Sequence, residues 1–427
     1  MDILIKDTPA LLYEDNGGMR ITTTNICISG RTIISVGDIP ENFVPRKTIG
    51  GSGFLAIPGL INCHTHSYMS VFRNFADDLT FNEWLFERIM PREDMLTNED
   101  GYHGAMLSCA EMIKTGTTCF MDMHMFKNMT AAAADQTGMR AVLSRGLVGS
   151  DRSDEGGLRR LDDTLSEMKQ WSINPRFGFM IAPHAIYTCG EDYLRYCTEK
   201  AKETGLSMHI HLSESPKEIK DCKKAHDGMT PVEYLESIGF FQVKTCAAHC
   251  VQCRESDIEI LKKHDVNVIH NPKSNLKLAN GIAPIPDMQK AGINICMGTD
   301  SQASNNSLNM FSEMNFAALI HKGANKDAQA VSARDVLRYA TVNGAKALGI
   351  NAGEIAAGKL ADIVLIDTER PEFYPRNDLI ASLVYSANGT EADTVVIDGE
   401  IVLENGRLTL ADEEEIYANA QKVTEKF

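Results

Sequence analysis

The sequence lacks any apolar stretch that approaches the roughly 18 consecutive apolar residues of a membrane-spanning helix. Its first residues have no basic region followed by an apolar run, which disfavours an export signal. It also lacks clustered Lys and Arg, and its formal net charge of -16 disfavours binding to a nucleic-acid backbone. We therefore expect a cytoplasmic protein that works without a membrane or nucleic-acid partner.

A disulfide framework is absent as well. The eleven cysteines are an odd number, scattered from Cys27 to Cys296 without regular spacing, which suits a reducing compartment where thiols stay free. Cys250 and Cys253, which follow Cys246, have the Cys-x-x-Cys spacing of a zinc site, but no second pair completes four ligands. We expect free thiols and no structural zinc.

What the sequence does contain is a change of pattern along its length. A chain of 427 residues exceeds the usual size of a single core, so we expect one large domain and one smaller domain. Residues 1–56 and 350–427 hold short β-runs broken by turns, whereas residues 57–349 alternate short apolar runs with amphipathic stretches. Because each end is too small to fold alone, we predict that both ends pair into one small β-sandwich domain.

The middle segment has the number of apolar runs expected for a (β/α)8 barrel. The candidate strands are 60–63, 117–121, 140–144, 177–181, 207–211, 245–248, 267–270 and 294–298. The stretches 82–89 and 332–347 carry apolar residues at helical spacing and predict helices on the outer ring. The fold class predicted is α/β, a TIM-type barrel with a composite β-sandwich built from both termini.

Metal-binding types of side chain lie at the C-terminal ends of these strands, where barrel enzymes place their active sites. His64 and His66 follow the first strand, and their spacing of two aims both imidazoles to the same side. An isolated His-x-His pair is more often structural than metal-binding. The polar residues at other strand ends, His211, Glu214 and His249 among them, favour a metal site instead.

The same segments resemble those of a known enzyme superfamily, the amidohydrolases. Four segments resemble its motifs and follow in its order: 58–66, 209–214, 247–250 and 297–300. The segments 271–278 and 304–307 are similar to the branch that contains methylthioadenosine/S-adenosylhomocysteine deaminases and triazine hydrolases. The resemblance covers nearly the whole chain.

This resemblance implies a catalytic centre with one divalent metal ion. Its ligands would be His64, His66, His211 and Asp300. We expect zinc, although the same ligands also accept Fe²⁺ and Mn²⁺, and such a metal lowers the pKa of bound water toward ~7. Asp300 would accept the proton of the water, Glu214 would protonate a ring nitrogen, and His249 would stabilise the tetrahedral adduct.

The resemblance also implies substrate contacts. Trp84 would line the pocket, and the Glu93 carboxylate would accept hydrogen bonds from two ribose hydroxyls. Arg145 would read the far end of the nucleoside, and His184 and Ser304 would be further contacts, Ser304 to the purine. Without the resemblance, Trp84 is equally a core aromatic and Glu93 a solvated helix cap.

One position departs from the family. The family has an arginine directly after a Gly-Gly pair, whereas here Gly156 and Gly157 are followed by Leu158, Arg159 and Arg160. A shift of one residue would place Arg159 there, where it would pair with the carboxylate of S-adenosylhomocysteine. The preferred 5'-substituent therefore stays open.

Taken together, these features predict a metal-dependent amidohydrolase that acts on a small-molecule purine nucleoside. The reaction expected is deamination of the adenine ring of S-adenosylhomocysteine, 5'-methylthioadenosine, 5'-deoxyadenosine or adenosine to the inosine product and ammonia. Glu214 favours deamination, because expelling an amine needs more proton delivery than expelling chloride. The alternatives are a deaminase or hydrolase of guanine, cytosine or an s-triazine, and a catalytically silent scaffold. Family analogy alone allows a homo-oligomer.

Overall fold

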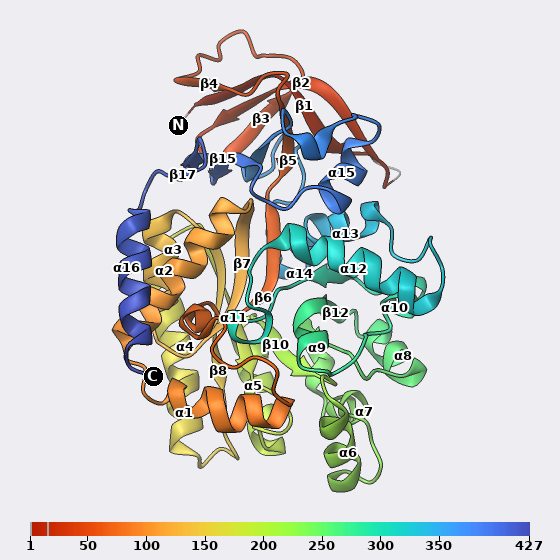
Figure 1. Cartoon of the computed structure of the whole chain (residues 1–427). Helices are drawn as coiled ribbons and strands as arrows, with labels where there is room; N and C mark the ends of the chain where they lie inside the picture. Colours follow the sequence, from red (N-terminus) through yellow and green to blue (C-terminus); the bar gives the residue numbers. More distant parts are fainter. Residues whose placement is uncertain (1, 15–16) are drawn as a thin grey trace.

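Two β-sheets organise the chain in the computed structural model, which describes residues 2–14 and 17–427 (Figure 1). One of them is an eight-stranded sheet of parallel strands that pair in sequence order. Its strands are β6 (Leu60–Thr65), β7 (Thr117–His124), β8 (Arg140–Leu147), β9 (Phe177–Pro183), β10 (Ser207–Leu212), β11 (Thr245–His249), β12 (Asn267–His270) and β13 (Ile295–Met297). Every predicted barrel strand is present, which confirms the TIM-type barrel.

The barrel closes where β6 meets the end of β13. The backbone N–H of Asp300 donates to the carbonyl oxygen of His64 at 2.9 Å. The Asn62 amide accepts from the Thr299 N–H at 3.1 Å and donates to the Thr299 hydroxyl at 2.7 Å. These bonds tie the first and last strands together next to two of the predicted metal ligands.

Helices surround the barrel (Figure 1). Among them are α2 (Asn98–Lys114), α3 (Met129–Thr137), α4 (Glu155–Trp171), α5 (Glu191–Thr204), α6 (Pro216–Ala225), α7 (Pro231–Ser237), α8 (Glu255–Lys263), α10 (Ile285–Lys290), α12 (Met310–Asn325), α13 (Ala333–Tyr339) and α14 (Val342–Leu348). The short ones over the strand ends and in connections are η1 (Ser67–Phe72), η2 (Glu83–Ile89), α1 (Met90–Glu93), η3 (Phe240–Gln242), α9 (Pro272–Lys277) and α11 (Gln302–Asn305). Capping boxes begin α2 at Thr97, α7 at Thr230 and α13 at Ser332, because each hydroxyl accepts from the third backbone N–H that follows.

Two predicted helices differ from the expectation. The stretch 82–89 forms η2, a π-helix, and the stretch 332–347 is broken into α13 and α14. The break lies at Thr341, whose backbone leaves the helical region with φ -133 and ψ -98. Its hydroxyl donates to the Leu337 carbonyl and lies 2.6 Å from the hydroxyl of Tyr13, so a contact with the N-terminal part of the chain accompanies the break.

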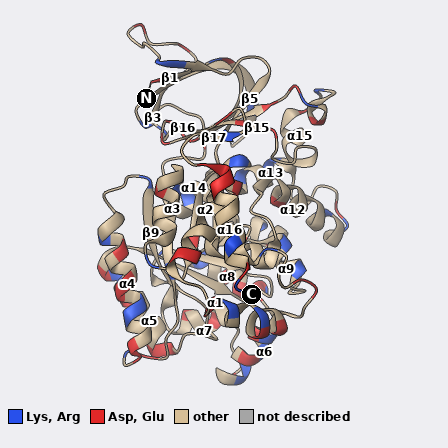
Figure 2. Ribbon diagram, turned by 60° about the vertical axis from the view of Figure 1, so that its left-hand side comes forward, with Lys and Arg blue, Asp and Glu red and all other residues tan. Residues whose placement is uncertain are grey.

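The second sheet is built from both ends of the chain, as predicted. Its strands are β1 (Ile3–Tyr13), β2 (Met19–Ser29), β3 (Thr32–Val36), β4 (Lys47–Ile49), β5 (Phe54–Pro58), β14 (Ile363–Asp367), β15 (Ala392–Ile397), β16 (Glu400–Glu404) and β17 (Arg407–Leu408). The antiparallel ladder between β5 and β14 joins the two ends. Figure 2 shows this sheet curled above the barrel, and apolar side chains from both ends, Ile28 and Ile363 among them, form its core.

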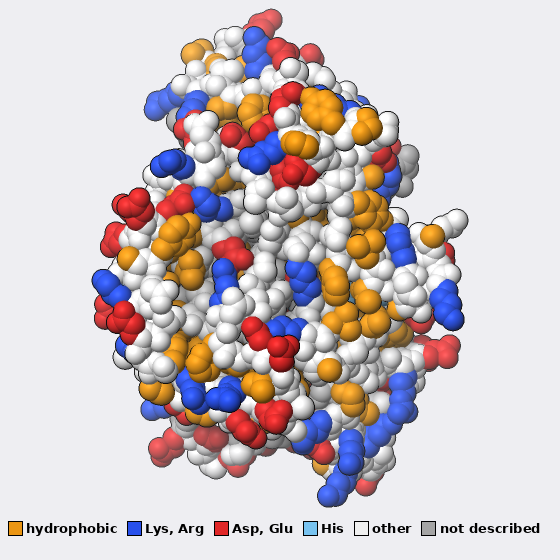
Figure 3. Space-filling view, in the orientation of Figure 1, with side chains coloured by type: hydrophobic (Ala, Val, Ile, Leu, Met, Phe, Trp, Pro, Cys, Tyr) orange, Lys and Arg blue, Asp and Glu red, His pale blue; other side chains and the backbone are white. Residues whose placement is uncertain are grey.

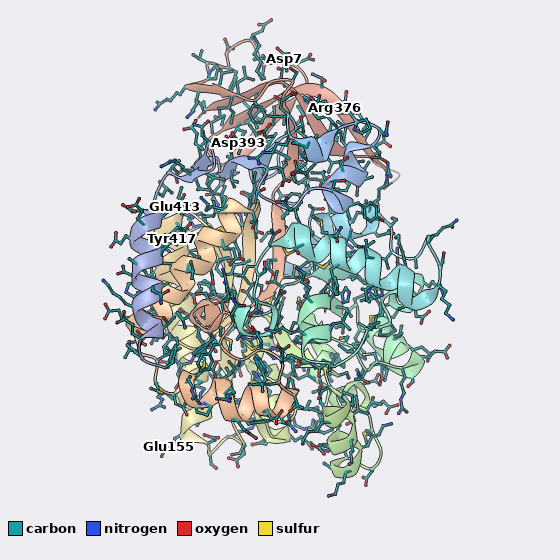
Figure 4. The ribbon with its side chains drawn as sticks, in the orientation of Figure 1. Asp7, Glu155, Arg376, Asp393, Glu413 and Tyr417 are labelled. Atoms are coloured by element: carbon teal, nitrogen blue, oxygen red, sulfur yellow. The ribbon has the colours of Figure 1, made fainter. Side chains whose placement is uncertain are left out.

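The C-terminal segment returns to the barrel. Two short helices, η4 (Pro371–Phe373) and α15 (Leu379–Tyr385), precede the last strands, and α16 (Glu413–Thr424) then lies along α2 (Figure 1). Glu413 and Tyr417, labelled in Figure 4, stand on α16, and Lys114 of α2 donates to the Glu413 carboxylate at 2.7 Å. Charged side chains of both signs are mixed over the face drawn in Figure 3. Within the described ranges, no helix has both the length and the apolar content needed to cross a membrane.

Candidate active site

Three histidines and one aspartate converge at the C-terminal ends of β6, β10 and β13. His64 Nε2 lies 3.4 Å and His66 Nε2 lies 3.5 Å from Asp300 Oδ1. His66 Nε2 lies 3.2 Å from His211 Nε2. The structure therefore brings together the four residues that the sequence predicts as metal ligands.

The protonation states of this cluster fit a divalent metal ion. His64 is fully buried, and its Nε2 has no hydrogen-bond partner among the described residues. Burial lowers the pKa of His64 to about 4 and holds the pKa of His211 well below its usual range, so both imidazoles are neutral at pH 7. Burial opposes ionisation of Asp300, but the His64 imidazole, 3.4 Å away, and the other nearby histidines hold its pKa well below the usual range. Neutral imidazoles and a carboxylate are the donor set that Zn²⁺ and related ions prefer.

The imidazoles are also oriented for metal binding. In each ring, Nδ1 is engaged with a partner outside the cluster, which leaves Nε2 toward the common point. The partners are the carbonyl of Met123 for His66 and that of His184 for His211, both at 2.8 Å, and Nε2 of His209 for His64 at 2.9 Å. A carbonyl accepts only, so His66 and His211 carry their protons on Nδ1 and offer the lone pair of Nε2.

Asp300 is held through one of its two oxygens. The hydroxyls of Ser274 and Ser304 donate to Oδ2 at 2.6 and 2.8 Å, which leaves Oδ1 toward the imidazoles. Ser304, predicted as a purine contact, is fully buried, and its hydroxyl also lies 2.9 Å from that of Ser274. Asp300 has a positive φ of 61, a conformation that non-glycine residues adopt mainly at constrained sites.

Glu214 and His249 face each other beside this cluster. Glu214 Oε2 lies 3.9 Å from His249 Nε2, and Glu214 Oε1 accepts from the Asn280 amide at 3.0 Å. Burial raises the pKa of the Glu214 carboxyl. Burial also opposes charging of His249, but the carboxylates of Glu214 and Asp300 outweigh it and raise the pKa of this imidazole. Nε2 of His249 is thus placed to donate to a developing negative charge.

His249 is close enough to the cluster to be considered a ligand itself. Two groups of side chains have ligand atoms that all lie within 4.8 Å of one another. They are His64, His66 and Asp300, and His64, His211 and His249. Among the described residues, no cysteine belongs to such a group, and all eleven cysteines are free, as expected.

The predicted pocket residues lie around the same strand ends. Trp84 of η2 is buried, and its indole N–H donates to the Ala303 carbonyl at 3.1 Å. Glu93 ends α1 and accepts a hydrogen bond from Tyr68 at 2.5 Å. The ring of His184 lies 4.6 Å from that of His211, centroid to centroid. Of these three residues, His184 contacts the cluster directly, and Trp84 and Glu93 bond to residues close to Asp300 and His66 in the sequence.

The two predicted arginines, Arg145 and Arg159, differ in their contacts. Arg145, on β8, donates to Asp163 of α4 at 2.5 Å, and Lys127 donates to the other oxygen of Asp163 at 3.2 Å. Arg159 is exposed on α4, whereas Arg160 donates to the carbonyl of Val148, just after β8, at 3.1 Å. Arg160 therefore contacts the barrel rim, whereas Arg159 makes no such bond among the described residues.

The structure adds residues that sequence reasoning missed. Glu218 accepts from the Glu214 N–H at 2.7 Å, and burial raises its pKa to about 7. The ring of Tyr187 lies 5.8 Å from that of His184, centroid to centroid, and Tyr187 is 39% exposed. Tyr68 lies two residues after His66, so the motif that contains His64 and His66 could have indicated it. The others lie in segments without a recognisable pattern.

Comparisons with known proteins agree with this geometry. Residues 55–402 match the Amidohydrolase family. The 5-methylthioadenosine/S-adenosylhomocysteine deaminase of Thermoanaerobacter pseudethanolicus is 44% identical over 427 residues, which cover 99% of this chain and 98% of that protein. The 5'-deoxyadenosine deaminase of Methanocaldococcus jannaschii is 43% identical over 405 residues, with 94% and 96% covered. A crystal structure of an adenosine deaminase from Xanthomonas campestris with bound zinc has a TM-score of 0.93 at 31% identity and covers 100% of this chain and 98% of that chain.

Proposed function

Because this chain belongs to the amidohydrolase family, we propose that it is a metal-dependent deaminase of adenosine-type nucleosides. The substrates are S-adenosylhomocysteine, 5'-methylthioadenosine, 5'-deoxyadenosine and adenosine, and the products are the corresponding inosine compound and ammonia. One observation carries the proposal. A buried carboxyl of raised pKa, Glu214, lies within 3.9 Å of His249 and next to the cluster of three histidines and Asp300.

The metal held by His64, His66, His211 and Asp300 is proposed to be zinc, in line with the zinc in the related adenosine deaminase structure. When bound, such an ion supplies a water of lowered pKa and hence a nucleophile at neutral pH. The barrel, residues 57–349, is proposed as the catalytic domain, with residues 1–56 and 350–427 as the composite β-domain.

The chain's own residues move the protons. Asp300 accepts the proton of the attacking water at Oδ1, because Ser274 and Ser304 occupy Oδ2. Glu214 holds a proton more readily than an exposed carboxyl does, and it gives that proton to the ring nitrogen beside the attacked carbon. Asp300 then passes the proton it took from the water to the amino group, which leaves as ammonia as the C–N bond breaks, and the proton of the added hydroxyl returns to Glu214 as the C=O bond forms. His249 stabilises the negative charge that develops on the oxygen added to the attacked carbon.

Substrate binding is assigned to the surrounding side chains. Trp84 and His184 border the base, and Glu93 accepts from the sugar hydroxyls. Arg145 and either Arg159 or Arg160 lie toward the 5'-substituent. Ser304 is assigned to the purine, and its hydroxyl also supports Asp300.

A substrate panel tests this function. Metal-loaded protein is assayed for ammonia release from the four adenosine compounds, guanine, cytosine and a chlorotriazine, with chloride also measured for the triazine. We expect ammonia from the adenosine compounds at rates far above those from the others. Turnover of only guanine, cytosine or the triazine would retain the metal site and overturn the nucleoside assignment. If none of the seven compounds releases ammonia or chloride, the proposal that the protein is an enzyme of this kind is wrong.

A further inference from the structure

One contact at the edge of the site joins two residues that the proposed reaction does not connect. The hydroxyl of Tyr68, on η1, lies 2.5 Å from Glu93 Oε1 at the end of α1. A carboxylate can only accept, so the tyrosine donates.

The side chain of Tyr68 is held in place by its contacts. Only 3% of its surface is exposed, and its ring packs edge to face on Phe126 with centroids 5.5 Å apart. A Cβ atom added at Gly104 of α2 would lie only 2.3 Å from the carbonyl oxygen of Tyr68, so α2 and η1 are in close contact. The preceding residue, Ser67, donates its N–H and hydroxyl to Asp122 at 2.7 and 2.8 Å. Tyr68 is thereby anchored to the barrel two residues from the metal ligand His66.

Glu93 has no comparable anchor of its own. It closes α1, a helix of four residues that follows the π-helix η2. Within the described ranges, the Tyr68 hydroxyl is the hydrogen-bond donor of its carboxylate, and no Lys or Arg forms an ion pair with it. Glu93 is half-buried, and its Oε2 accepts no hydrogen bond among the described residues. Oε2 is left for a ligand.

We propose that Tyr68 is a specificity-determining positioning residue, whose phenol fixes Glu93 so that Oε2 meets a sugar hydroxyl of the nucleoside. The inference rests on the proposed deaminase function and deepens it. The distance between the sugar and the reacting ring is then set by η1, which follows directly from a metal ligand, and not by the short helix that carries Glu93. Loss of the phenol weakens binding of hydroxylated sugars without altering the chemical step.

Tyr68→Phe tests this role, because it keeps the ring and removes only the donor. Adenosine and 2',3'-dideoxyadenosine are compared as substrates, with metal content and thermal melting measured in parallel. For adenosine we expect KM to rise by about tenfold with kcat little changed, as for loss of a hydrogen bond to a charged group. For the dideoxy compound both constants stay as in the unmodified protein. Tyr102→Phe is the matched control, because its hydroxyl contacts Gln136 away from the site.

A double-mutant cycle with Glu93→Gln separates positioning from general support of the fold. If Tyr68 acts through Glu93, Glu93→Gln alone already reduces the difference in KM between adenosine and 2',3'-dideoxyadenosine. Adding Tyr68→Phe to Glu93→Gln then reduces this difference no further. Additive effects, or an equal loss on both substrates, would overturn the inference. So would wild-type protein that deaminates both compounds with the same KM. Absence of deamination with any adenosine compound would instead overturn the proposed function, which keeps the two failures distinct.

Discussion

The orientation of each histidine near Asp300 is set by the hydrogen-bond partner of its Nδ1 atom. His66 and His211 donate from Nδ1 to backbone carbonyls, and His64 Nδ1 meets the imidazole of His209 at 2.9 Å. His209 is fully buried and burial holds its pKa well below the usual range, so it acts as a neutral acceptor or donor. Its Nδ1 has no partner among the described residues, which makes the contact with His64 its main polar interaction.

We expect His209→Phe to weaken metal binding by about 10- to 100-fold, the usual effect of removing the partner of a ligating histidine. His209→Gln keeps an acceptor and should lose less. Zinc affinity measured by competition with a chelating indicator checks this without relying on turnover. His321→Gln is the control, because its buried contact, 3.0 Å to His270, involves none of the four proposed metal ligands. Unchanged affinity in His209→Phe would contradict the prediction.

Glu214→Gln is expected to retain the metal and to lower kcat by about 10²- to 10⁴-fold, because the amide cannot deliver a proton to the ring nitrogen. The amide keeps the size of the carboxyl and can still meet Asn280. Kinetics on adenosine, together with metal content by atomic absorption, check the prediction. Full activity of the variant would remove Glu214 from the mechanism.

At the scale of elements, α4 sets the orientation of the two neighbouring arginines, Arg159 and Arg160. Its N-cap is Asp154, whose carboxylate accepts from the Gly157 N–H at 2.9 Å, and this sets the rotation of the first turn. Glu155, labelled in Figure 4, marks this end of the helix. With that rotation Arg159 is exposed and Arg160 reaches the rim at Val148.

Arg160→Gln should therefore raise KM for S-adenosylhomocysteine relative to 5'-methylthioadenosine by about tenfold, through loss of one charge-assisted contact to the amino-acid carboxylate. Arg159→Gln should leave the ratio unchanged. Steady-state kinetics on both substrates check the pair. The reverse pattern would restore Arg159 to the position expected from the sequence.

At the scale of the whole molecule, a buried ion network joins the barrel to the terminal sheet. Arg140, at the start of β8, lies 2.7 Å from Asp362 and 2.7 Å from Asp398, and its side chain is only 2% exposed. Arg31 of the N-terminal part also lies 2.7 Å from Asp398. Three segments that are distant in sequence therefore share one set of charges.

Asp362→Asn is expected to destabilise the protein by about 3 to 5 kcal/mol, because it leaves the buried Arg140 partly uncompensated. Thermal or urea unfolding measures the effect. Asp221→Asn is the control, since its pair with Lys217 is exposed on α6, and we expect no measurable change. Equal stability of the two variants would show that the network does not join the domains.

The same network predicts a response to acid. Burial opposes ionisation of Asp398, but hydrogen bonds from Arg31 and Arg140 outweigh it and lower the pKa of this carboxyl. Its contribution to stability is therefore complete above the unfolded pKa of about 3.9 and is lost as pH falls through the lower folded value. Asp398→Asn should flatten the acid side of the stability profile, measured by urea unfolding at several pH values. An unchanged profile would contradict the assignment.

The amino-acid sequence by itself determined the barrel and the metal cluster. The strands are visible as short apolar runs, and the ligands lie at strand ends, because parallel strands of a barrel bring those ends to one rim. Positions such as His64 and Asp300 thus follow from local pattern and order along the chain. The pairing of both ends into one sheet follows in the same way, since neither end is large enough to fold alone.

Only the tertiary structure decided contacts between side chains that are distant in sequence. The helix break at Thr341 involves Tyr13, the Glu93 carboxylate meets Tyr68, and the Ser304 hydroxyl donates to Asp300. The choice between Arg159 and Arg160 depends on a shift of one residue along the helix, which is a rotation of about 100° that local pattern does not resolve. Periodicity along a chain records which face of an element is buried, whereas partners across the fold arise from packing between elements.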